Sequence, residues 1–416
     1  MGRLSRNIYS LVCLLSYVAC SYSAWGADSA PGADVTKLLQ LARQQNPEFA
    51  ATRLEADAAA ERIASAAALP DPVLRTELRD FTNQSGNPSV YYRVMQTLPW
   101  PGKRGLQQEV AEAESKQAQG RSALSWAELA ARIKINFAQY YVLVRSEKLT
   151  QEIFDLVTRL EHIAQARYAT GLAPQQDVIR AQMEQTELRR DLVMLNTDQH
   201  HAMTRLNTLL QREPYAPLAE PQHLRPLPAA DKLTLAALEE RLRIHNPQLF
   251  TLNAQLATAE KSRALTLKNR YPDITVGLAP TQIRGKITEW ELMFELNIPL
   301  QQQSRRSRER EADTLLAAAR SRKEAAANQL LGDLVENVLA LDAAQRLVTL
   351  NANSLQPQAE ASLQAALAGY QNGKVDFATL LDAQRQILKA KLDVLNAQAE
   401  AQTRLAEIEK LVGEEL

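Results

Sequence analysis

The chain has 416 residues, and its 48 Lys and Arg side chains are balanced by 48 Asp and Glu side chains. This balance excludes the basic surface of a nucleic-acid-binding protein and the acidic excess of a disordered tail. Apolar residues make up 45% of the chain, enough for a packed core, whereas only 14 glycines and 5% aromatic residues favour long helices.

The amino terminus is typical of a secretory signal peptide, which we expect at residues 1–26. Arg3 and Arg6 form its charged region, and Ile8–Cys20 is an apolar stretch too short to span a bilayer. Ser21-Tyr-Ser23 and Ala24-Trp-Gly26 both offer small residues before a possible cut, and we favour cleavage after Gly26.

Both cysteines of the chain, Cys13 and Cys20, lie in this segment. Val18-Ala19-Cys20 resembles a lipoprotein cleavage box, although Tyr17 stands where Leu is usual, so lipidation of Cys20 stays open. A mature chain would have no disulfide, catalytic thiol or thiolate metal ligand. Later stretches fall short of the roughly 20 apolar residues of a membrane helix, so an exported chain would be soluble, lipid-anchored or a β-barrel.

The sequence repeats itself once, with landmarks in the same order about 200 residues apart, far longer than a solenoid period. This repetition predicts a tandem duplication, with a first structural repeat at 27–210, a proline-rich linker at 211–231 and a second repeat at 232–416. The paired landmarks are NPEF and NPQL, LPDP and YPDI, QTLPWPGKR and LNIPLQQQSRR, and RYATG and GYQNG.

Each repeat begins with a helix and a β-hairpin. Asn46 and Asn246 are good N-cap residues, each followed by a proline suited to the first helical turn, and Pro70 and Pro272 end these helices. The period then changes from 3.6 to 2. Apolar and polar residues alternate from Val73 onward, which predicts β-hairpins at about 70–99 and 271–299, each with one wet face.

A long helical hairpin follows each β-hairpin, at about 103–210 and 304–412. Apolar residues recur at spacings of three and four from Lys103 to Tyr168, a length of roughly 100 Å at 1.5 Å per residue. Pro357 is the main interruption in the second hairpin. Helices of this length must pack side by side as coiled coils or as staves of a hollow cylinder.

Four strands cannot close a barrel, and an open edge cannot lie in lipid because its backbone groups would be unsatisfied. Two alternatives remain. The hairpins form a small soluble sheet, or three chains pool their strands into twelve.

Two paired motifs identify a resemblance. Arg167-Tyr168-x-x-Gly171 and Tyr370-x-x-Gly373, followed at equal distances by Ala181-Gln182 and Ala383-Gln384, resemble the TolC family of outer-membrane efflux proteins. LPDP and LPWPGKR are similar to its heavy-metal branch. The resemblance implies a mainly α chain with a small β part. It also implies a homotrimer with a twelve-stranded outer-membrane β-barrel, continued by a long periplasmic α-helical barrel.

The same resemblance implies partners. A periplasmic adaptor (membrane fusion protein) would dock on the tunnel tips, and an inner-membrane pump of the RND type would supply energy. The tips map to Gly171, Leu172, Gly373 and Val375, and both glycines should adopt positive φ. The alternative is that they are only helix C-caps.

A periplasmic gate is implied close to these tips. Its members map to Asp177, Tyr370, Lys374, Thr379 and Asp382. Two positions depart from the family, because Val375 stands where an Arg is expected and Thr379 where an Asp is expected. A ring of three Asp382 carboxylates would narrow the pore, whereas the alternative pairs Asp382 with Arg385 on the same helix face.

We therefore predict a passive outer-membrane export channel, and its LPDP and LPWPGKR motifs favour heavy-metal cations as the cargo. The alternatives are a drug-efflux or type I secretion channel and, from another class, a soluble periplasmic coiled-coil scaffold. No GxSxG, HExxH, P-loop or GxGxxG context predicts an enzyme, and no cofactor is implied. His200-His201 does not predict a metal site because adjacent residues do not share a helix face.

Overall fold

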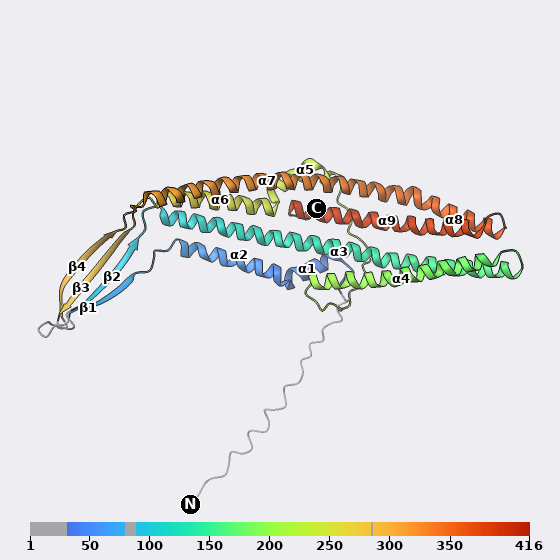
Figure 1. Cartoon of the computed structure of the whole chain (residues 1–416), viewed down its shortest axis with the longest axis horizontal. Coiled ribbons are helices and arrows are strands. Elements are labelled where there is room, and N and C mark those ends of the chain that lie inside the picture. The colour runs from blue at the N-terminus through green and yellow to red at the C-terminus, as the bar shows by residue number, and fades with distance from the viewer. Residues whose placement is uncertain (1–30, 80–88, 284–285) are drawn as a thin grey trace, which may run out of the picture.

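The computed structural model describes residues 31–79, 89–283 and 286–416. The predicted signal peptide, Cys20 and the centres of the two β-hairpins lie outside these residues. The described chain is a long rod (Figure 1), with a four-stranded sheet at one end and the turns of two helical hairpins at the other. It is mainly α-helical with a small β part, as the sequence predicts.

The first half of the chain contains two short helices, a β-hairpin and a long helical hairpin. Asp34 caps the first helix through its side chain, and the sequence analysis missed this helix. The elements are α1 (Val35–Gln45), α2 (Pro47–Ala66), β1 (Val73–Arg79), β2 (Ser89–Leu98), α3 (Lys103–Ala169, 67 residues) and α4 (Gln175–Leu209).

The second half repeats this order after the linker. Within the described residues, no helix is both long and apolar enough to cross a membrane. The elements are a 3₁₀ turn (Ala230–Leu233), α5 (Leu235–His245), α6 (Pro247–Lys268), β3 (Ile274–Ile283), β4 (Lys286–Leu296), α7 (Gln302–Leu350), a π-helical turn (Asn351–Leu355), α8 (Gln356–Gln371) and α9 (Phe377–Val412).

Pro357 accounts for the break between α7 and α8. Proline has no backbone N–H, so the carbonyl of Asn353 loses its helical partner, and the ring crowds that turn. The chain accommodates this with the π-helical turn at Asn351–Leu355, directly before the proline. The corresponding helix α3 has no such interruption over its 67 residues.

The strands form one antiparallel sheet in the order β1-β2-β3-β4, so β2 and β3 join the two halves of the chain. One row of directly paired residues runs Leu74, Val94, Leu278 and Leu292, and all four are exposed. The opposite face carries charged residues of the strands, with Arg75, Glu77 and Arg93 on β1 and β2 and Glu291 and Glu295 on β4. The sheet therefore has one apolar and one polar face.

The predicted caps Asn46 and Asn246 are confirmed, and each does more than cap. The Asn46 side chain accepts from the Phe49 amide at 3.0 Å and donates to the Leu209 carbonyl at 3.0 Å. Asn246 accepts from the Leu249 amide at 2.7 Å and donates to the Leu411 carbonyl at 2.6 Å. Each buried asparagine thus fastens a short helix to the end of the long helix that returns from the tip.

A buried ion cluster joins the two halves near the middle of the rod. The Lys134 ammonium of α3 lies 2.9 Å from the Glu409 carboxylate of α9. Arg225, from the linker, donates to both Glu409 oxygens at 3.0 Å. Burial raises the pKa of Glu409, but the hydrogen bonds and charge of Arg225 and the charge of Lys134 outweigh it, so this pKa is lowered. The linker is therefore pinned to both repeats by one carboxylate.

We expect Asn246→Ala to lower the unfolding free energy by about 2 kcal/mol, because it removes a helix cap and leaves the buried Leu411 carbonyl unpaired. The measurement is the denaturant midpoint of the purified protein, followed by helical circular dichroism. Asn269→Ala, at the exposed end of the same helix, is the matched control and should change the unfolding free energy by less than about 0.5 kcal/mol. Equal effects of the two substitutions would contradict this role of Asn246.

Candidate functional site at the tips of the helical hairpins

The two long helical hairpins end in the same backbone motif. Gly171 has φ 72° and Gly373 has φ 70°, which confirms the positive φ predicted for both. The Gly171 amide donates to the Tyr168 carbonyl at 2.9 Å, and the next amide donates to the Arg167 carbonyl at 2.8 Å. The turn at Gly373 has the corresponding pair of bonds, at 3.0 and 2.8 Å. These are Schellman motifs, which satisfy the last carbonyls of α3 and α8.

Arg167 connects the two tips. Its Nη1 donates to the Gln371 carbonyl of the second tip at 2.8 Å, and its Nη2 donates to the Leu172 carbonyl of its own tip at 3.3 Å. The guanidinium also lies 5.0 Å from the centre of the Tyr370 ring, within cation–π range. Sequence reasoning noted Arg167 only as part of a motif. Its counterpart in the second repeat is Gly369, and this difference between the repeats could have singled out Arg167.

Tyr370 and Asp177, both predicted gate residues, lie in contact. The Tyr370 hydroxyl donates to Asp177 Oδ2 at 3.2 Å, and both side chains are buried. Burial and the neighbouring Asp177 carboxylate raise the pKa of Tyr370 to about 12. The phenol therefore stays protonated at neutral pH and remains a donor to the carboxylate.

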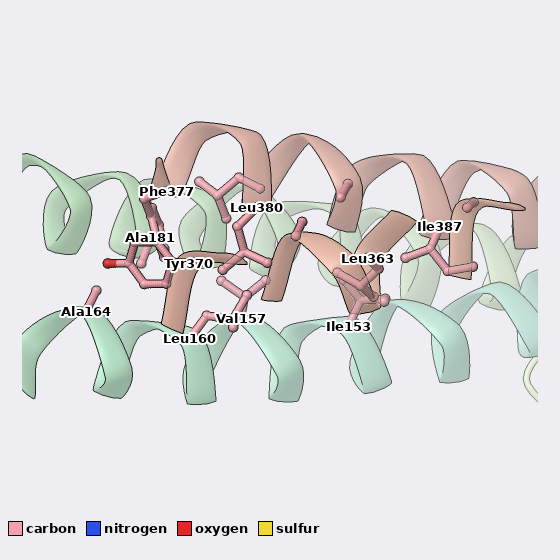
Figure 2. Packing of buried hydrophobic residues seen from close by; sticks show 14 of the residues in the cluster. Ile153, Val157, Leu160, Ala164, Ala181, Leu363, Tyr370, Phe377, Leu380 and Ile387 are labelled. Carbon is pink, nitrogen blue, oxygen red and sulfur yellow. The ribbon is translucent and has the colours of Figure 1, made fainter. Parts of the chain in front are cut away.

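A hydrophobic cluster from both hairpins holds this contact in place (Figure 2). Leu160 and Ala164 of α3 face Tyr370 of α8 and Phe377 of α9, and the Tyr370 and Phe377 rings meet edge to face at 5.2 Å. Ala181 of α4 closes the same layer. The packing of small and large side chains brings the two tips together.

The remaining predicted residues lie in different surroundings. Lys374 and Leu172 are exposed, Leu172 to 68%. Val375 is half-buried and packs against Gly369, where an added Cβ would meet its Cγ2 at 2.9 Å. Its place inside the second hairpin explains how an apolar residue is accommodated at the position where an arginine is expected.

Thr379 and Asp382 lie exposed at the start of α9. The Thr379 amide and hydroxyl donate to the Asp376 side chain at 2.9 and 2.6 Å, and these bonds, the hydroxyl first, lower the pKa of Asp376. The pairing of Asp382 with Arg385, the alternative in the sequence analysis, is not formed. Arg385 Nε instead donates to Glu184 of α4 at 2.9 Å.

The two repeats differ at a half-buried position behind the tips, which is Glu161 in the first hairpin. In the first hairpin, Gln182 and Gln185 of α4 donate to the Glu161 carboxylate of α3 at 2.9 and 2.7 Å. In the second hairpin the counterpart of Glu161 is Leu363. As a result, both amide atoms of the fully buried Gln384 have no partner among the described residues. The first hairpin is cross-linked by hydrogen bonds, and the second relies on apolar packing.

Nothing in the described residues gathers three His, Cys, Asp or Glu side chains that could hold a metal ion. The site is a contact between two hairpin ends. Its charged and aromatic groups join the ends of the two helical hairpins.

Comparison with known proteins decides the family. The model of the outer membrane efflux protein family matches residues 38–211 and 238–414, one segment in each half. The chain belongs to this family. The resemblance found in the sequence is thereby confirmed, and the chain is an outer-membrane protein whose helices extend into the periplasm.

Similar proteins agree with this membership. The cobalt-zinc-cadmium resistance protein CzcC of Cupriavidus metallidurans is 24% identical over 386 residues, covering 90% of this chain and 88% of that protein. The outer-membrane channel OprN matches with a TM-score of 0.78 at 18% identity, covering 91% of this chain and 89% of that one. The CusC channel matches with a TM-score of 0.79 at 14% identity, covering 91% and 92%. These structures share the fold of this chain.

We expect Tyr370→Phe to loosen the tips, because it leaves the buried Asp177 carboxylate without its donor. A hydrogen bond to a charged group is worth about 1.5–3 kcal/mol, so backbone amides of both turns should exchange with deuterium roughly tenfold to a hundredfold faster. Tyr168→Phe is the matched control, since Tyr168 occupies the corresponding place in the first tip and is 47% exposed. Similar exchange in the two variants would contradict a special role of Tyr370.

The contact should also weaken in alkali. The folded pKa of Tyr370 is raised from 10.0 to about 12, so its contribution is complete below pH 10 and is lost as the pH rises toward 12. The Tyr370→Phe protein should lose less tip protection over this interval than the parent protein.

Proposed function

We propose that this chain is the passive outer-membrane conduit of a tripartite efflux system that exports heavy-metal cations. Membership of the outer membrane efflux protein family supports the conduit. The observation that carries the cargo class is the similarity to the cobalt-zinc-cadmium resistance protein CzcC over 90% of the chain. In this proposal the metal ion is cargo, the chain performs no enzymatic reaction, and it needs no cofactor.

The functional unit is a homotrimer with a twelve-stranded barrel. The open sheet supports this assembly, because within the described residues β1 and β4 each have one edge without a strand beside it. Such an edge cannot lie in hydrocarbon, where its backbone N–H and C=O groups would have no partners. The apolar face of the sheet suits lipid, and the polar face suits a water-filled lumen.

The tips are the contact surface for a periplasmic adaptor, which couples the conduit to an inner-membrane RND-type pump. Gly171, Leu172 and Gly373 supply the exposed part of this surface, and the exposed leucine suits an apolar contact. Val375 supports it from inside the second hairpin by packing against Gly369.

The gate is the contact between the two tips. Tyr370, Asp177 and the positioning residue Arg167 hold the second hairpin against the first, with Lys374, Thr379 and Asp382 beside them on the second tip. Opening requires that the Arg167 bonds and the Tyr370–Asp177 bond break together. The second hairpin is the one that would move, since it lacks the Glu161 network that cross-links the first.

The cargo class can be tested by inactivating the gene in its host. We expect intracellular zinc, cobalt or cadmium, measured by mass spectrometry, to rise several-fold under metal challenge, because the exit from the periplasm is lost. Reintroducing the intact gene is the control. Unchanged metal content with increased sensitivity to organic drugs would favour a drug-efflux channel instead.

Asp382 offers a test of the gate. Threefold symmetry would bring three exposed Asp382 carboxylates around one axis, and like charges held close attract multivalent cations. In planar bilayers, Asp382→Asn should raise at least tenfold the concentration of lanthanum that blocks current from the periplasmic side. Asp342→Asn, on α7 away from the tips, should leave block unchanged. Equally tight block in the Asp382 variant would exclude a ring at this position.

A further inference from the structure

The joint between β2 and β3 is where the first repeat meets the second in the sheet. Its register is unbroken over residues 94–98 of β2 and 274–278 of β3. Met95 lies opposite Gly277, and Gln96 lies opposite Val276. In a closed ring of repeats, the second repeat of one copy meets the first repeat of the next copy in the equivalent way. The joint inside the chain is therefore a template for the seam between copies.

The duplication gives the residue offsets that convert positions in one repeat into positions in the other. Asp71 recurs as Asp273, an offset of 202 residues, and Pro99 recurs as Pro299, an offset of 200. The hairpins provide an independent check, because these offsets turn the β1–β2 pair Val73–Met95 into Thr275–Glu295. That pair is observed between β3 and β4. Each strand of the second repeat thus has a defined counterpart in the first.

We propose that β4 of one copy pairs antiparallel with β1 of a second copy in the register that places Glu295 opposite Arg75. The pair Met95–Gly277 becomes Glu295–Arg75, and the pair Gln96–Val276 becomes Leu296–Leu74. The apolar face then continues across the seam, and a cross-seam ion pair forms on the polar face. This proposal rests on the trimer proposed above and specifies how its copies join.

Charge complementarity supports this register without reference to the duplication. Arg75 and Glu295 lie exposed on the two edge strands, and neither has an ion pair with any described residue. Glu77, the next residue on the same face, is already paired with Arg93 at 3.3 Å. Arg75 and Glu295, the two residues that the template brings together, therefore carry unpaired charges of opposite sign.

Neighbouring registers are unfavourable. A slip of two residues in one direction puts Glu77 opposite Glu291, and a slip in the other direction puts it opposite Glu295. Like charges directly opposite each other destabilise a strand pair. A slip of one residue would turn the apolar face of one strand toward the polar face of the other.

The helices beside the sheet fit the same partner. Inside the chain, α3 of the first repeat packs against α6 of the second. The equivalent contact between copies joins α7 to α2 of the next copy. Both helices carry exposed leucines, including Leu339 on α7, exposed to 65%, and Leu54 on α2, exposed to 62%. A second copy of this chain would cover these side chains.

Disulfide cross-linking tests the register in the full-length protein purified in detergent. Directly opposed residues of antiparallel strands lie about 4.5–5.5 Å apart between Cα atoms, within disulfide range, whereas residues displaced by two lie about 7–8 Å apart. Arg75→Cys with Glu295→Cys should therefore give covalent dimers and trimers on a non-reducing gel under mild oxidation. Each single variant and the displaced pair Val73→Cys with Glu295→Cys should give little.

The outcomes separate this proposal from the trimer itself. Cross-links in the displaced pair alone would overturn the register and leave the trimer standing. A trimer by native mass measurement without cross-links in either pair would overturn the β4–β1 seam. A monomer by mass would overturn both proposals.

Charge reversal gives a second test that does not depend on cysteine chemistry. Arg75→Glu should lower the fraction of trimer that survives dilution in detergent, because it faces Glu295 with a like charge. Adding Glu295→Arg to the same protein should restore that fraction. No rescue by the double substitution would contradict the pairing.

Discussion

A strand edge in hydrocarbon exposes backbone N–H and C=O groups that nothing there can pair, and the architecture of this chain answers that constraint. One chain supplies four strands, with β1 and β4 at the edges. The two repeats are joined through β2 and β3, so the chain already contains one example of the joint that a closed assembly needs. In the trimer proposed above, repeating this joint would close the sheet and set the order of the helices below it.

The helices below the sheet are held in place by hydrogen-bonded contacts, and two kinds of contact occur once in each repeat. Asn46 and Asn246 each cap a short helix and bind the end of a returning long helix, and the Schellman turns at Gly171 and Gly373 close the tips in the same way. Glu409 holds Lys134 and the linker residue Arg225. A rod of roughly 100 Å has little core per unit length, so such local fastenings limit how far its segments can slide.

Two differences between the repeats lie near the tips. Arg167 has a glycine as its counterpart, and Glu161 has Leu363. The first hairpin therefore carries the charged groups that reach across to the second, while the second presents Tyr370, apolar packing and the unsatisfied Gln384. The first hairpin is thus cross-linked by its own hydrogen bonds, whereas the second is held by contacts at its end, and this asymmetry suits the gate proposed above.

The sequence by itself determined the mainly helical class, the duplication, the caps at Asn46 and Asn246 and the positive φ of the tip glycines. These features depend on residues close in the chain or on repetition, and both can be read without a fold. Only the tertiary structure decided which groups the charged side chains near the tips bind. Arg385 chooses Glu184 of α4 over Asp382 on its own helix, and Arg167 reaches a carbonyl 204 residues away. Which charged group lies within reach depends on how the hairpins pack, and helical periodicity specifies a face without specifying what covers it.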